Sequence, residues 1–98
     1  MDLQGAVAIV TGGNGGLGQR LCHALAQAGS HVAVVYAHSR APAQGVAEEL
    51  RGLGVQSEAL ACDVGEPQQV QQLVSQVVKA FGRVDILVND AAYNKWIA

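Results

Sequence analysis

The chain has 98 residues, of which 50% are hydrophobic and 14% are charged, and its formal net charge is -2 at pH 7. This length corresponds to one domain at most. The charge balance lacks the basic surface that nucleic-acid binding requires, and no run of about 18 apolar residues predicts a membrane span. The N-terminus, Met1-Asp2-Leu3-Gln4-Gly5, has no positive region before an apolar stretch, so it does not resemble a signal peptide. Composition therefore favours a cytoplasmic protein with neither nucleic acid nor membrane as a partner.

The first predicted strand, residues 6–10, runs directly into a glycine-rich turn, Thr11-Gly12-Gly13-Asn14-Gly15-Gly16-Leu17-Gly18. A helix is predicted next, over residues 16–28. Strand, glycine turn and helix in this order allow backbone N–H groups and a helix N-terminus to meet a phosphate. No Lys-Ser or Lys-Thr pair follows the last glycine, which excludes a Walker-type loop. The turn predicts a nucleotide-binding site, and the alternative is a glycine-rich turn that binds no ligand.

Further strands are predicted over residues 31–36, 57–62 and 84–89, and further helices over 42–53 and 67–81. Strands that alternate with helices of this length imply right-handed crossovers and a parallel sheet. We therefore expect an α/β protein, a Rossmann-like three-layer αβα sandwich with strand order 3-2-1-4, which stops after the fourth strand and leaves that strand as an open edge.

Two predicted helices have apolar positions at helical spacing, and these positions are expected to face the core. In the first helix they are Leu17, Leu21, Leu25 and Ala28, and in the third they are Val70, Leu73, Val74, Val77, Val78 and Phe81. Cys22 and Cys62 lack the spacing of metal or redox pairs and are expected to be packing residues, so no metal site is predicted.

Three motifs occur together: Thr11-Gly-x-x-x-Gly16-x-Gly18, Asp63-Val64 at the end of the third strand, and Asp85-Ile-Leu-Val-Asn89-Asp90-Ala91-Ala92 along and beyond the fourth. In this combination the chain resembles the short-chain dehydrogenase/reductase family, of the classical type that includes 3-oxoacyl-carrier-protein reductases. The resemblance implies that residues 1–98 are the N-terminal part of an NAD(P)-binding Rossmann domain. It also implies hydride transfer between NADP(H) and a carbonyl or alcohol substrate, in complete members that are homo-oligomers and whose interface helices this chain lacks.

The resemblance implies contacts to a nicotinamide dinucleotide at positions that match the family's motifs. These are Gly12, Gly16 and Gly18 beneath the pyrophosphate, Asn14 and Leu17 beside it, Asp63 and Val64 at the adenine, and Asn89, Ala91 and Ala92 along the far side. The family's usual fourth-strand motif reads Asn-Asn-Ala-Gly. In this chain a carboxylate, Asp90, replaces the second asparagine, and Ala92 replaces the glycine.

The cofactor preference is predicted from the end of the second strand, Tyr36-Ala37-His38-Ser39-Arg40. NAD-selective folds place a carboxylate there to bind the ribose 2′-hydroxyl, and this segment has none. The guanidinium of Arg40 and the hydroxyl of Ser39 would instead bind a 2′-phosphate, which favours NADP(H) over NAD(H). The alternative is that Arg40 only begins a solvated helix.

No catalytic residue is predicted in this chain. The resemblance implies a serine and a Tyr-x-x-x-Lys pair as proton-transfer groups, but the residue four positions after Tyr93 is Ile97, and Lys95 is only two positions away. We therefore expect the N-terminal part of a longer oxidoreductase. The alternative is a free-standing dinucleotide-binding or interaction module that catalyses no reaction.

Overall fold

The computed structural model describes residues 2–90. Strands and helices alternate along this range in the order β1 (Val7–Thr11), α1 (Gly16–Gln27), β2 (His31–Tyr36), α2 (Arg40–Gly52), β3 (Ser57–Ala61), α3 (Pro67–Phe81) and β4 (Ile86–Asn89). The number, type and order of the elements are those predicted from the sequence.

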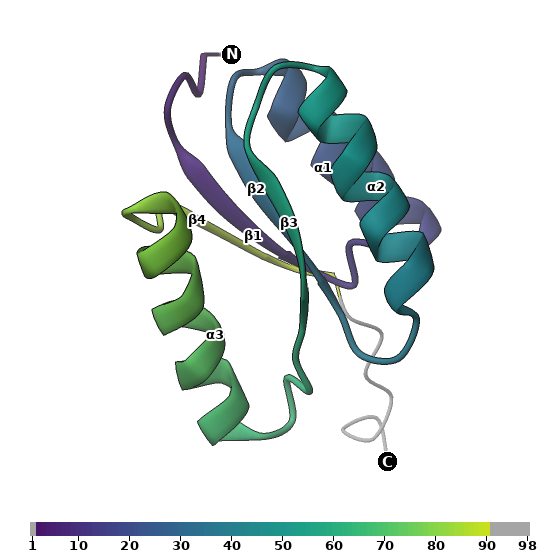
Figure 1. The fold of residues 1–98 in the computed structure, drawn as a ribbon, viewed down its shortest axis with the longest axis vertical. Helices are drawn as coiled ribbons and strands as arrows, with labels where there is room; N and C mark the ends of the chain where they lie inside the picture. The colour runs from purple at the N-terminus through teal and green to yellow at the C-terminus, as the bar shows by residue number, and fades with distance from the viewer. Residues whose placement is uncertain (1, 91–98) are drawn as a thin grey trace.

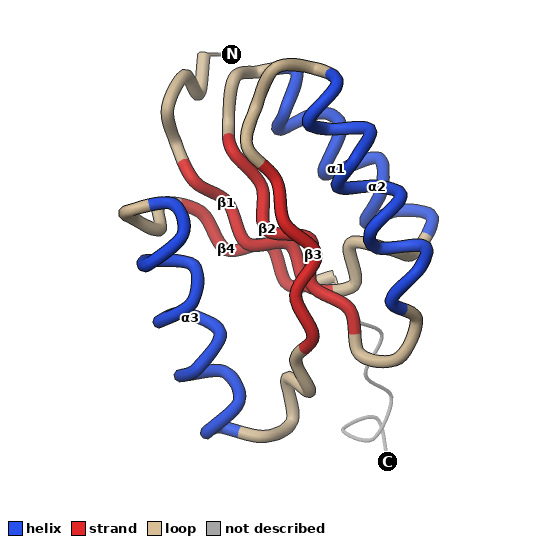
Figure 2. The backbone as a smooth tube through the Cα atoms, viewed as in Figure 1, coloured by secondary structure: helices blue, strands red, loops and turns tan. Residues whose placement is uncertain are grey.

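All three strand pairings are parallel, and the order across the sheet is β3-β2-β1-β4. Helices α1 and α2 cover one face of this sheet and α3 covers the other (Figure 1). The tube view shows the same three layers, with the strands between the two helical layers (Figure 2). The predicted αβα sandwich with strand order 3-2-1-4 is therefore confirmed, and β4 is the outer strand of the described sheet.

The core lies on both faces of the two central strands. Val10, Val32 and Val34 pack toward α1 and α2, whereas Ile9 and Val35 pack toward α3. Burial of both faces explains why β1 and β2 are continuous apolar runs and do not alternate with polar residues. Within the described residues, none of the helices is both long and apolar enough to cross a membrane.

The predicted core face of α1 is wrong. Its buried residues are Gly18, Cys22 and Ala26, one position along from the leucine row, while Leu17 is 59% exposed. The small side chains on this face allow α1 to approach the sheet closely, and the leucines lie to the side. Leu25 packs only partly against the core.

The apolar face predicted for α3 is only partly buried. Leu73 and Val77 are buried, whereas Val74 and Val78 are 41% and 45% exposed. Leu87, which is in register with Ile9 and so faces the same side of the sheet as α3, is 66% exposed. Among the described residues, one helix alone covers this face, and one helix cannot bury an apolar stripe of that width.

Several element boundaries differ from the prediction. Helix α2 begins at Arg40, two residues before Pro42, the predicted start. Strand β4 begins at Ile86, two residues after the predicted start, and the side chain of the preceding residue, Asp85, is bonded to β1. The backbone N–H of Asp85 donates to the Val7 carbonyl at 2.9 Å, and the Asp85 carboxylate accepts a hydrogen bond from the Val7 N–H at 2.9 Å. The Asp85 side chain thus replaces a ladder bond at the start of β1.

Candidate functional site at the carboxyl ends of the strands

The four parallel strands end at one edge of the sheet, which we call the carboxyl edge and define by Thr11, Tyr36, Ala61 and Asn89. The register aligns these ends, since Thr11 is paired with both Val35 and Asn89, and Tyr36 with Ala61. In open α/β sheets ligands bind outside the carboxyl ends, where the strand order reverses. In this sheet that point lies between β1, which leads to the glycine turn, and β4.

Three glycines of the turn are required by the fold itself. Gly12 has a φ of +71°, which L side chains rarely adopt. A Cβ at Gly18 would collide with the Gly12 carbonyl oxygen, and a Cβ at Gly13 would lie 2.9 Å from Val34 Cγ1. The Gly13 N–H also donates to the Val35 carbonyl at 3.2 Å, which ties the turn to the end of β2.

Gly16, the first residue of α1, differs from these three glycines. A Cβ at this position would meet no atom within 4 Å, and its φ is not in the left-handed region. Neither the backbone nor the packing of the described residues therefore requires glycine here. The space that the missing side chain leaves open lies at the N-terminus of the helix.

The N-terminus of α1 presents free hydrogen-bond donors. Among the described residues, the backbone N–H groups of Gly16, Leu17 and Gly18 have no acceptor, and the first acceptor in the helix is the Gly15 carbonyl, bonded to the Gln19 N–H at 2.8 Å. The first turn contains no acidic residue, and the N-cap Gly15 provides no side-chain cap. Free N–H groups at the positive end of a helix form an anion-binding site.

The hydroxyl of Thr11 joins β1 to β4 at the carboxyl edge. Thr11 Oγ1 donates to Asn89 Oδ1 at 2.8 Å and accepts from the Asp90 N–H at 3.2 Å. The Asp90 N–H also lies 3.2 Å from the Thr11 carbonyl. Thr11 is 4% exposed whereas Asn89 is exposed, so the network is buried at its Thr11 end, and it holds the end of β4 beside the start of the glycine turn.

A family model for short chain dehydrogenases matches residues 6–97. The chain belongs to the short-chain dehydrogenase family. It is 40% identical over 89 residues to L-rhamnose 1-dehydrogenase (NAD(P)(+)) of Sphingomonas sp., which covers 91% of this chain and 35% of that protein. It is 41% identical over 88 residues to a 3-oxoacyl-(acyl-carrier-protein) reductase of Staphylococcus epidermidis, which covers 90% of this chain and 36% of the reductase.

A crystal structure of hydroxysteroid dehydrogenase from Escherichia coli superposes with a TM-score of 0.87 at 34% identity, covering 95% of this chain and 39% of that one. The chain thus spans about a third of the length of the short-chain dehydrogenases to which it is similar. Enzymes of this family bind NAD(P), and the chain's similarity to them includes the strand, glycine turn and helix described above.

Asp63, which the family resemblance assigns to the adenine, also has a structural role. Its Oδ1 accepts the Gly65 N–H at 2.9 Å, and its own N–H donates to Gln69 Oε1 at 2.7 Å, so it forms the turn that leads into α3. The remaining carboxylate oxygen, Oδ2, makes no hydrogen bond among the described residues. Val64 is partly buried against the core on the α3 side, and it follows the end of β3 at Ala61, which is part of the carboxyl edge.

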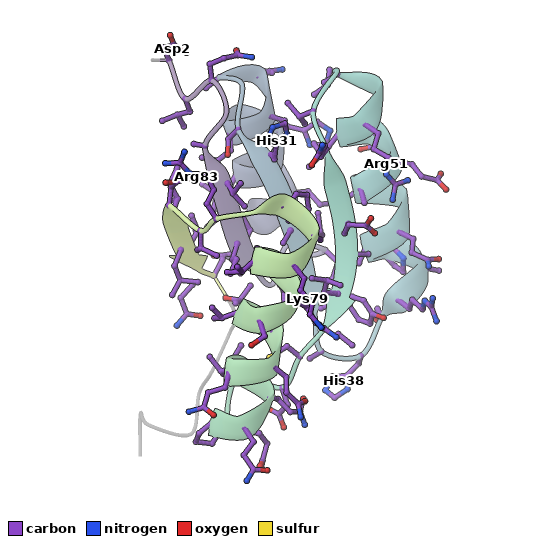
Figure 3. The ribbon with its side chains drawn as sticks, turned by 60° about the vertical axis from the view of Figure 1, so that its left-hand side comes forward. Asp2, His31, His38, Arg51, Lys79 and Arg83 are labelled. Carbon is purple, nitrogen blue, oxygen red and sulfur yellow. The ribbon has the colours of Figure 1, made fainter. Side chains whose placement is uncertain are left out.

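Ser39 and Arg40 lie at the start of α2, both exposed. Ser39 is at the N-cap position, but its hydroxyl makes no capping hydrogen bond, so it is free to meet a ligand. Figure 3 shows the preceding residue, His38, in the β2–α2 connection at the end of the molecule where the strands finish, and His31 and Arg83 at the opposite end. The structure thus brings the segment 38–40 to the carboxyl edge.

The other predicted contacts are distributed as follows. Asn14 is partly buried in the turn, where its carbonyl accepts from Gln19 Nε2 at 2.9 Å, and Leu17 is exposed beside it. Asn89 lies at the end of β4, whereas Ala91 and Ala92 are outside the described residues, as are Tyr93 and Lys95.

Thr11 was predicted only as a member of the motif, and its hydroxyl network is the contribution that the sequence analysis missed. A threonine as the last residue of a buried strand was the available signal.

The described residues fit a dinucleotide at this edge. The unfilled space at Gly16 allows a ligand to approach the backbone, and the three free N–H groups at the start of α1 are the donors that a pyrophosphate requires. Ser39 and Arg40, at the start of α2, add exposed donors at the same edge of the sheet.

Proposed function

We propose that this chain binds a nicotinamide dinucleotide at the carboxyl edge and prefers NADP(H) to NAD(H). The observation that carries the proposal is that an unfilled space at Gly16 lies beside free N–H groups at residues 16–18. In the described structure no side chain fills this space, and no acceptor bonds to these N–H groups. Gly12 and Gly18 shape the turn beneath the pyrophosphate, and Asn14 and Leu17 flank it. Asp63 Oδ2 accepts a hydrogen bond from the adenine amino group, with the Val64 backbone beside it.

The preference for NADP(H) rests on the chemistry of the segment from Tyr36 to Arg40. This segment contains no carboxylate that would repel a 2′-phosphate. The exposed Arg40 guanidinium and the uncommitted Ser39 hydroxyl supply charge-assisted hydrogen bonds to it, and both lie at the positive end of α2. The alternative was that Arg40 only begins a solvated helix. Helix α2 does begin at Arg40, and this is compatible with phosphate binding because helix N-termini attract phosphate.

We further propose that the chain is the cofactor-binding part of a short-chain dehydrogenase that transfers hydride between NADP(H) and a carbonyl or alcohol compound. The nicotinamide supplies the hydride, and Asn89, Ala91 and Ala92 line the side of the cofactor remote from the adenine. Residues 1–98 bind and orient the cofactor. They lack a Tyr-x-x-x-Lys pair, so the proton needed at the substrate oxygen comes from a group that these residues do not supply.

Calorimetric titration of the 98-residue chain with NADPH and with NADH tests the preference, because the two ligands differ only in the 2′-phosphate. We expect NADPH to bind about tenfold more tightly, and Arg40→Gln to remove the difference while leaving NADH binding unchanged. Lys79→Gln, on the exposed surface of α3, is the matched control and should change neither affinity. Equal affinities in the unmutated chain would overturn the preference, and no binding of either ligand would overturn the site.

A further inference from the structure

Helices α1 and α2 are joined at their outer surface by a histidine. The Nε2 atom of His23, on α1, lies 3.1 Å from Oε1 of Glu49, on α2. The other ring nitrogen, Nδ1, lies 2.8 Å from the carbonyl oxygen of Gln19, one turn earlier on α1. The His23 side chain is 34% exposed and that of Glu49 is 61% exposed, so both groups are open to protons from solvent.

Both partners of His23 are acceptors. A backbone carbonyl cannot donate a hydrogen bond, and a glutamate carboxylate is ionised and donates none above about pH 5. Each ring nitrogen must therefore carry a proton for both contacts to exist together. This is the imidazolium form, because a neutral ring has one N–H and one lone pair. A neutral ring would direct its nitrogen lone pair at either the Gln19 carbonyl oxygen or the Glu49 carboxylate, and two acceptors form no hydrogen bond.

The surroundings of His23 contain few other charges. On its own helix, Arg20 lies one turn earlier and lines the same shallow groove, with Gln19 and Gln27 as neutral neighbours. On α2, the described charged residues are Arg40, Glu48, Glu49 and Arg51, and of these only Glu49 is within ion-pair distance of His23. The Arg51 guanidinium donates to the Ser57 carbonyl at 2.9 Å and so is directed toward β3. The ring therefore interacts with one carboxylate across the helix interface.

We propose that His23 and Glu49 form a proton-dependent link between α1 and α2. When the ring is protonated it holds Glu49 and the Gln19 carbonyl at once, and when it loses a proton one of the two contacts is lost. The link is therefore made by the charged ring and weakened in the neutral ring. The two helices begin at Gly16 and Arg40, so the link joins the elements that carry the two ends of the carboxyl-edge site.

The chain contains a second histidine whose geometry predicts the opposite behaviour. His31 Nδ1 accepts a hydrogen bond from the Gln56 backbone N–H at 2.9 Å, so this contact requires a lone pair on Nδ1. Protonation of His31 would remove that acceptor. His31 therefore serves as an internal control, because a general effect of pH on histidines would move both residues in the same direction.

A double-mutant cycle with His23→Gln, Glu49→Gln and the double variant tests the link, with urea unfolding of the 98-residue chain measured at pH 5.5 and pH 8.5. We expect a coupling of about two- to fivefold in the unfolding equilibrium constant at pH 5.5, as found for exposed ion pairs, and a value near onefold at pH 8.5. Glu48→Gln in place of Glu49→Gln is the matched control and should give no coupling at either pH.

The ¹⁵N shifts of the His23 ring in the unmutated chain provide a second measurement that does not depend on the folding of any variant. At pH 5.5 both ring nitrogens of His23 should show protonated shifts, as two acceptors at hydrogen-bond distance require. His31 Nδ1, which accepts from the Gln56 N–H, should show the shift of an unprotonated nitrogen while that contact is made. A coupling that is equal at the two pH values, or a ring nitrogen of His23 that is unprotonated at pH 5.5, would overturn the proposal.

Discussion

The Thr11 hydroxyl donates a hydrogen bond to Asn89 Oδ1 across 2.8 Å, and so joins the ends of β1 and β4, which are 78 residues apart in the chain. The same hydroxyl oxygen accepts from the Asp90 N–H. Because Asn89 Oδ1 is engaged by Thr11, the Asn89 side chain is oriented with its amide NH₂ as the remaining donor. One buried hydroxyl thereby fixes the position of a predicted cofactor contact relative to the glycine turn.

Replacing Thr11 by valine should destabilise the chain by about 1 kcal/mol, because the shape is kept while Asn89 Oδ1 loses its donor and the Asp90 N–H keeps only the Thr11 carbonyl, at 3.2 Å. Urea unfolding monitored by circular dichroism measures the difference. Thr11→Ser keeps the hydroxyl and should retain most of the stability that the valine variant loses. A valine variant as stable as the serine variant would show that the network contributes nothing to folding.

The arrangement of the sheet could be predicted from the sequence because it depends on local patterns. Continuous apolar runs such as 31–36 identify central parallel strands, and a glycine after each helix marks where it ends, as at Gly29 and Gly82, whose φ angles are +100° and +91°. The glycine turn was recognisable because its spacing reflects steric requirements that Gly12 and Gly18 meet within eight residues.

The features that could not be predicted depend on contacts between distant residues. The leucine row of α1 is as apolar as its buried face, and only the close approach of the helix to β1 and β2 selects Gly18, Cys22 and Ala26. The use of Asp63 Oδ1 in the turn before α3 requires the backbone of Gly65 to fold back on it. Hydropathy and spacing contain no information on either relationship.

The glycines at positions 16 and 18 should respond differently to substitution by alanine. Gly18→Ala forces a Cβ against the Gly12 carbonyl and should lower the free energy of unfolding by at least about 2 kcal/mol. Gly16→Ala meets open space and should leave stability within about 0.5 kcal/mol of the unmutated chain.

Thermal unfolding with and without NADPH separates the two effects. A ligand that binds only the native state raises its stability by RT ln(1 + [L]/Kd), so binding appears as an upward shift of the melting temperature. Gly16→Ala should keep the unliganded melting temperature but reduce the shift, and Gly16→Val should abolish it. If Gly16→Val retained the full shift, the space at this residue would not be the pyrophosphate site.

The ion pair of Asp85 predicts a specific dependence of stability on pH. A hydrogen bond from the Arg83 guanidinium, and next the Val7 N–H, hold the pKa of the Asp85 carboxyl below its ordinary value. The carboxylate therefore contributes stability that is fully present above that ordinary value, about 3.9, and is lost as the pH falls below it.

Unfolding free energies of the unmutated chain and of Asp85→Asn should differ most at pH 5.5, and the difference should shrink at pH 3.0. Asp2→Asn is the control, since Asp2 is an exposed carboxylate that accepts only the Gln4 N–H at 3.0 Å. A difference that grows on acidification would mean that Asp85 favours the native state through its protonated form, contrary to the geometry.

The two cysteines should be unreactive in the folded chain. Cys22 is fully buried on α1, and burial, with a smaller contribution from the Asp90 charge, raises its pKa to about 12. Cys62 is 4% exposed, and burial followed by the charge of Asp63 raises its pKa as well. Because the thiolate is the reactive form, both residues combine low access with a low thiolate fraction at pH 8.

Titration with a disulfide reagent such as 5,5′-dithiobis(2-nitrobenzoate) at pH 8 checks this expectation. The native chain should react only as fast as it opens, and addition of urea should release both thiols at once. Cys62→Ser isolates Cys22, which should be the slower of the two because it lies beneath Gly13, with its Sγ 3.3 Å from the position of a Cβ there. Rapid labelling of Cys22 in the absence of urea would mean that α1 separates from the sheet in the native state, and the anion-binding N-terminus of that helix would then not be preformed.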